Sequence, residues 1–128
     1  MGKTLGILIL SSLVALPCVA SAESRNVVIF FTKWSARIDK PAAEAVRDAA
    51  GMASKRGAGT LLVTGFADTT GSPRAGALLS ATRAQVVVDQ LTADGVPAAR
   101  IHQTSNGSTA FVGTSLESRR VTITIPFQ

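Results

Sequence analysis

The stretch GFADTTGSPRAGALLSATRAQVV, residues 65–87, carries the most informative pattern in the chain. An apolar run over residues 61–66 ends at Ala67, and the next residue is Asp68. A segment rich in glycine, serine and proline follows, and then an amphipathic pattern with Arg83 near its start. An acidic and a basic side chain therefore flank a turn at the end of a predicted strand. This arrangement fits an ion pair, a helix cap or a site for a ligand that carries both charges.

Apolar periodicity on both sides of this stretch predicts an α+β fold. Strands are expected where β-branched and aromatic residues form short apolar runs or alternate with polar ones, at 26–31, 60–66, 101–105 and 121–125. Helices are expected over residues 41–56 and in the second half of the quoted stretch, where apolar residues recur at helical spacing. This order predicts a two-layer βαβαββ sandwich, with two main helices packed on one face of a mixed four-stranded sheet.

The N-terminal segment has the pattern of an export signal. A short basic start precedes an apolar run over residues 5–16, and the small residues Ala20 and Ala22 form a cleavage pattern. The run is shorter than the roughly 20 apolar residues of a membrane span. We therefore expect a signal peptide over residues 1–22 and one domain over residues 23–128, with an uncut N-terminal anchor as the alternative.

Cys18 is the only cysteine and raises the further alternative of a lipoprotein anchored there. Pro17 fits badly beside a lipoprotein cleavage site, so cleavage after Ala22 is preferred, and it leaves a domain without disulfides. From Glu23 on, the chain has 12 basic and 8 acidic residues, a net charge of +4. Since an exported protein rarely meets nucleic acid, an anionic polymer of the cell envelope is the expected electrostatic partner.

The sequence offers little for catalysis or metal binding. It contains no nucleophile paired with a base and no two carboxylates at useful spacing, so we expect no enzyme and no cofactor. His102 is the only histidine and has no cysteine or acid cluster beside it, which argues against a metal site. Trp34, the only tryptophan, is compatible with stacking on a sugar or with covering the edge of the core.

Several motifs at fixed spacings resemble the OmpA-like peptidoglycan-binding domain. Gly71, Leu79-Ser80 and Arg83-Ala84 follow Asp68 as in the family signature (Thr/Ala)-Asp-x-x-Gly…Leu-Ser-x-x-Arg-Ala, and Ala67 before the aspartate is closer to the peptidoglycan-associated lipoprotein branch. Other matches extend the resemblance over essentially all of residues 23–128: Phe31 with Ser35-Ala36 and Ile38, Gly95-Val96 with Arg100-Ile101, and Ser118-Arg119-Arg120-Val121.

The resemblance implies non-catalytic binding of peptidoglycan in the periplasm of a Gram-negative cell, next to the cell wall and outer membrane. Such domains hold diaminopimelate of the stem peptide, whose side-chain end carries an ammonium and a carboxylate. An aspartate takes the ammonium and an arginine forks onto the carboxylate. By position Asp68 and Arg83 carry these roles, with Ala67 and Leu79 beside them. Arg119 is either a second contact or an outward strand charge, and other envelope proteins stay open as partners.

The start of the second helix decides where Arg83 lies relative to this ligand. In one straight helix from Pro73, Arg83 would lie about 15 Å along the axis at about 1.5 Å per residue, too far to share a small ligand with Asp68. In a helix capped by Ser80, Arg83 would lie in the first turn, beside N–H groups that favour an anion. We prefer the second arrangement, with residues 73–79 as a separate short turn.

Departures from the family pattern leave a second function open. Gly76 stands where the family has an asparagine eight residues after the aspartate, which favours a degenerate domain that serves as a protein-interaction or structural module. The retained Asp68 and Arg83 argue against that alternative. Phe31 is followed by Thr32-Lys33-Trp34, whereas the entry strand of the family usually continues as Phe-Asp-Phe-Asp or similar. The segment between Gly107 and Arg119 is shorter than in many relatives. These differences are expected to affect affinity more than fold.

Overall fold

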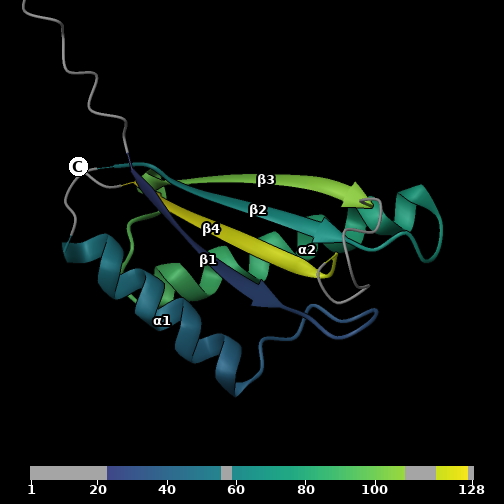
Figure 1. Cartoon of the computed structure of the whole chain (residues 1–128), viewed down its shortest axis with the longest axis horizontal. Helices are drawn as coiled ribbons and strands as arrows, with labels where there is room; N and C mark the ends of the chain where they lie inside the picture. The colour runs from purple at the N-terminus through teal and green to yellow at the C-terminus, as the bar shows by residue number, and fades with distance from the viewer. Residues whose placement is uncertain (1–22, 56–58, 109–117, 127–128) are drawn as a thin grey trace, which may run out of the picture.

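The computed structural model describes residues 23–55, 59–108 and 118–126, which form one sheet and two main helices (Figure 1). The elements in chain order are β1 (Ser24–Phe30), α1 (Lys40–Lys55), β2 (Leu61–Ala67), α2 (Pro73–Ala93), the 3-10 turn η1 (Ala98–Arg100), β3 (Ile101–Ser108) and β4 (Arg120–Pro126). The predicted α+β architecture, two helices packed against a mixed four-stranded sheet, is confirmed. Within the described ranges, no helix is both long and apolar enough to cross a bilayer. The expected signal peptide lies outside them.

The last strand of the chain lies inside the sheet, whose order is β1-β4-β2-β3. Strand β4 pairs antiparallel with both β1 and β2, while β2 and β3 are parallel. Strands β1, β2 and β3 therefore run in the same direction, and their carboxyl ends meet the start of β4 at one edge (Figure 1). We call this the carboxyl edge of the sheet. Loops that leave or enter it are brought close together in space.

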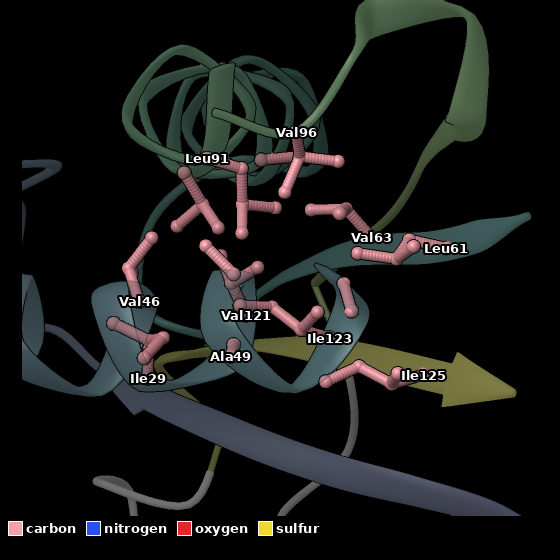
Figure 2. Packing of buried hydrophobic residues seen from close by; sticks show 14 of the residues in the cluster. Ile29, Val46, Ala49, Leu61, Val63, Leu91, Val96, Val121, Ile123 and Ile125 are labelled. Carbon is pink, nitrogen blue, oxygen red and sulfur yellow. The ribbon is translucent and has the colours of Figure 1, made fainter. Parts of the chain in front are cut away.

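The core lies between one face of the sheet and the two helices. Along β4, buried Val121, Ile123 and Ile125 alternate with half-buried threonines, as the period of two predicts. Figure 2 shows these side chains meeting side chains from the helices. The side chains that the helices contribute to this core are mostly small. They are Ala42, Val46, Ala49, Ala50 and Ala53 from α1 and Ala84, Val87 and Leu91 from α2. Small side chains let the helices approach the sheet closely.

Helix α2 begins at Pro73, so the expected separate turn over residues 73–79 is wrong. Ser72 is the N-cap, and its Oγ accepts a hydrogen bond of 3.1 Å from the Ala75 N–H. Ser80 lies inside the helix and is fully buried; its Oγ accepts from the Gly107 N–H of β3 at 3.0 Å. Ser80 therefore joins α2 to β3 and does not cap a helix.

Two glycines set the distance between α2 and the sheet. A Cβ added at Gly65 of β2 would overlap the carbonyl oxygen of Ser80. A Cβ added at Gly76 would overlap the Ser108 hydroxyl and lie 3.2 Å from the Ser108 Cβ, which is tighter than ordinary packing. Packing against β3 therefore accounts for Gly76. The alternative of a degenerate interaction module, which the missing asparagine suggested, stays a prediction.

Candidate functional site

Three segments meet at the carboxyl edge and build a charged site. Asp68 directly follows β2, Arg119 directly precedes β4, and residues 31–39 form the loop that leaves β1. The backbone N–H of Phe31 donates to the carbonyl oxygen of Arg119 at 2.9 Å, which ties the first loop to the start of β4. The central place of β4 in the sheet is what brings these distant parts of the sequence together.

Asp68 is an ionised carboxylate held by its own turn. Its Oδ1 accepts a 3.1 Å hydrogen bond from the Thr70 N–H and a second one from the Thr70 hydroxyl. Only 8% of Asp68 is exposed. Burial raises the pKa of Asp68, but the hydrogen bonds from Thr70 and the charges of Arg119 and Arg83 outweigh it, so the pKa lies below the ordinary value of 3.8. The group therefore carries a full negative charge at neutral pH.

Arg119 is the cation that faces this carboxylate. Its Nη1 lies 3.8 Å from Asp68 Oδ2, which is longer than an ordinary N–H···O hydrogen bond. The Nε of Arg119 is buried and has no hydrogen-bond partner among the described residues. The side chain keeps 16% of its surface exposed. The pair is thus held by charge attraction at a distance longer than a hydrogen bond.

Arg83 is fully buried and serves as a clamp between α2, β2 and the first loop. Its Nε donates to the Ser35 carbonyl at 2.8 Å, its Nη1 to the Phe66 carbonyl at 3.1 Å, and its Nη2 to the Thr32 carbonyl at 3.1 Å. Its guanidinium carbon also lies 5.4 Å from the centre of the Phe31 ring. Burial lowers the pKa of Arg83, Asp68 raises it and Arg119 lowers it, with a net decrease. An arginine still stays protonated at neutral pH.

Each of the three Arg83 nitrogens donates one hydrogen bond to a backbone carbonyl, and the expected fork of Arg83 onto a ligand carboxylate stays a prediction. The argument that a helix from Pro73 carries Arg83 too far from Asp68 is wrong. The first turns of α2 project past the carboxyl edge, and the helix then runs back along the sheet (Figure 1). Arg83 consequently reaches Phe66, just before Ala67 and Asp68.

The other two residues expected at the site contribute no charged group. Ala67 is the last residue of β2, is 1% exposed and has Ser108 of β3 as its register partner. Leu79 lies half-buried on α2, one residue before Ser80. Ala67 thus directly precedes Asp68 at the carboxyl edge. His102 is exposed on β3, and in the part of the chain that the structure describes no three His, Cys, Asp or Glu side chains gather as a metal site would need.

The structure adds Thr70 to the site and shows where Trp34 lies, a residue for which the sequence left sugar stacking and core covering open. Thr70 orients the Asp68 carboxylate, and a hydroxyl residue two positions after an aspartate is a usable signal for that turn. Trp34 is 55% exposed and packs against Gly71, where an added Cβ would overlap its Cη2. No sequence signal joins Trp34 to Gly71, because the contact depends on where two separate loops meet.

The chain belongs to the OmpA family, whose family model matches residues 30–120. A comparison with curated proteins finds no match. The fold is similar to the OmpA-like domain of FopA1 from Francisella tularensis subsp. tularensis SCHU S4, at 17% identity and a TM-score of 0.75 over 81% of this chain and 73% of that one.

Two further solved structures are similar to this chain. The peptidoglycan-associated lipoprotein from Burkholderia pseudomallei is 18% identical, with a TM-score of 0.67 over 77% of this chain and 88% of that one. The cell wall anchor of the T6SS from Pseudomonas aeruginosa is 28% identical, with a TM-score of 0.68 over 82% of each chain.

Proposed function

We propose that this chain binds peptidoglycan without catalysis, through diaminopimelate of the stem peptide, in the periplasm of a Gram-negative cell. The observation that carries this proposal is the loose pair of Asp68 and Arg119, whose Oδ2 and Nη1 lie 3.8 Å apart. A ligand end that carries an ammonium and a carboxylate complements both charges. The similar proteins named as a peptidoglycan-associated lipoprotein and a cell wall anchor support the association with peptidoglycan.

In this proposal Asp68 accepts hydrogen bonds from the ammonium, and Arg119 donates to the carboxylate. Arg119 replaces Arg83 as the direct partner of the carboxylate, because Arg83 has no exposed surface and its nitrogens are already engaged. The ligand would exchange one long ion pair for two sets of charge-assisted hydrogen bonds, which are shorter and stronger. Arg83 then acts as a positioning residue that fixes the first loop and the end of β2.

The compartment is part of the proposal. We infer that residues 1–22 are removed before Glu23 and that Cys18 carries no lipid, which leaves the domain in the periplasm. Intact-mass analysis of protein from the envelope fraction tests this directly. A mass that corresponds to acyl chains on Cys18 would replace the soluble mature form with a membrane-anchored one.

Co-sedimentation with isolated sacculi tests the function itself. We expect the purified protein to sediment with sacculi that contain diaminopimelate and to stay largely in the supernatant with sacculi in which lysine takes its place. Lysine supplies the ammonium for Asp68 but lacks the carboxylate for Arg119. Sedimentation with neither type of sacculus would contradict the proposal. Equal sedimentation with both would contradict its assignment to diaminopimelate.

A further inference from the structure

Trp34 has a backbone conformation that a large side chain rarely adopts. Its φ angle is +59°, and among the described residues no other residue except glycine has a positive φ. Such a conformation is unfavourable for a residue with a Cβ, and it persists only where the surrounding contacts fix it. The side chain is nevertheless 55% exposed and lies outside the buried core cluster. Burial of the ring therefore does not explain why the loop holds this conformation.

The loop is fixed from both sides of Trp34. The Ser35 N–H donates to the Thr32 carbonyl at 3.1 Å and closes a tight turn around the tryptophan. The buried guanidinium of Arg83 donates to the carbonyls of both Thr32 and Ser35. The position of the indole therefore depends on Arg83, the same residue that holds the end of β2 through Phe66.

The indole lies against the turn that begins at Asp68. A Cβ added at Gly71 would overlap Trp34 Cη2 and lie 3.2 Å from Cζ3, so the six-membered ring occupies the space that a side chain there would take. Thr70, the residue before Gly71, donates to the Asp68 carboxylate. One part of the ring is thus supported by the backbone of the site, and more than half of the residue's surface faces solvent.

We propose that Trp34 is a stacking surface for a sugar ring of the peptidoglycan glycan, so that the carboxyl edge binds sugar and peptide together. This inference rests on the proposed function. A pyranose ring presents a face of C–H groups, and a fixed, exposed tryptophan beside a charged site offers the apolar surface that such a face needs. A rigid aromatic platform loses little conformational entropy on binding, which favours it over a flexible apolar chain.

Three ligands separate this inference from the proposed function: the disaccharide-stem peptide, the stem peptide alone and the disaccharide alone. Trp34 is the only tryptophan, so its emission reports on contact at this residue alone. We expect the wild-type protein to bind the disaccharide-stem peptide about fivefold more tightly than the stem peptide. The emission of Trp34 should change with the disaccharide-stem peptide and stay nearly constant with the stem peptide.

Variants assign the sugar contact to the ring. Trp34→Ala should abolish the advantage of the disaccharide-stem peptide while the affinity for the stem peptide stays within about twofold. Trp34→Phe should keep part of that advantage because it keeps an aromatic ring. This variant also controls for the possibility that alanine changes the conformation of the loop. Leu78→Ala is the matched control, since Leu78 is 63% exposed on α2 and should have no effect.

Two results would overturn the inference while leaving the proposed function intact. One is equal affinity of the wild-type protein for the two peptide ligands. The other is an equal loss of affinity for both ligands in Trp34→Ala, because Trp34 would then contact the peptide. Failure of the wild-type protein to bind either peptide ligand would overturn both proposals.

Discussion

Arg119 Nη1 lies 3.8 Å from Asp68 Oδ2, although the two residues are far apart in the sequence. The register of the sheet explains this proximity, because Gly65 of β2 faces Val121 of β4 in an antiparallel pair. The end of β2, after Gly65, and the start of β4, before Val121, must therefore lie side by side. The guanidinium of Arg120 lies 4.0 Å from the centre of the Phe66 ring and supports the same alignment.

The lowered pKa of Asp68 predicts where pH affects the domain. A carboxyl group whose pKa is lower in the folded state stabilises the fold above its unfolded-state pKa, and this contribution is lost as pH falls through the folded-state pKa. The difference in free energy of unfolding between wild-type protein and Asp68→Asn should therefore stay constant from about pH 8 to about pH 5 and shrink below about pH 4. Urea denaturation of both proteins across this range measures it. A difference that varies between about pH 5 and pH 8 would show that another group dominates.

Arg83 is expected to matter for stability through the three carbonyls that it satisfies. Arg83→Met would leave the carbonyls of Thr32, Ser35 and Phe66 without this partner inside the protein, at about 1–3 kcal/mol for each one that water does not reach. We expect a total loss of about 3–5 kcal/mol in urea denaturation. Arg74→Ala, an exposed arginine at the start of the same helix, should change stability by less than about 0.5 kcal/mol. Equal effects of the two substitutions would contradict the clamp.

The space around three glycines predicts that substitutions at Gly65 and Gly76 destabilise the fold and that a substitution at Gly51 stabilises it. Gly65→Ala and Gly76→Asn place new atoms against Ser80 and Ser108, and each should destabilise the fold by about 1–3 kcal/mol. Gly51 lies in α1 with no atom within 4 Å of an added Cβ, so Gly51→Ala should stabilise it by about 0.5–1 kcal/mol. Melting temperatures of the three variants check this order. A Gly76→Asn variant as stable as wild type would show that Ser108 can move away from the new side chain without a loss of stability.

The fold could be predicted because its signals are local. The alternation of Val121, Ile123 and Ile125 with threonines marks a half-buried strand, and the apolar stripe of α1 marks a helix. The start of α2 could not be fixed in the same way. Ser72 and Ser80 are both suitable caps followed by helical residues, and the choice between them depends on contacts with β3.

The residues of the candidate site could be proposed from the sequence, but their geometry could not. Asp68 and Arg119 stand out by motif, and their proximity follows only from the pairing of β4 with β2. The partners of Arg83 are backbone carbonyls in distant segments. Since every residue has a backbone carbonyl, the sequence does not indicate which ones accept a hydrogen bond from Arg83. The motif therefore singles out Arg83, but it does not predict the hydrogen bonds that Arg83 makes inside the protein.

Titration calorimetry with a stem peptide that contains diaminopimelate tests the central claim most directly. Asp68→Asn and Arg119→Met should each weaken binding by about 30-fold or more, because removing one partner of a buried charge pair costs about 2 kcal/mol at least. Arg47→Ala, an exposed arginine on α1, is the control and should bind like wild type. The account predicts this pattern together with weak binding of the corresponding lysine peptide. Wild-type affinity in both Asp68→Asn and Arg119→Met, with the fold intact, would contradict it.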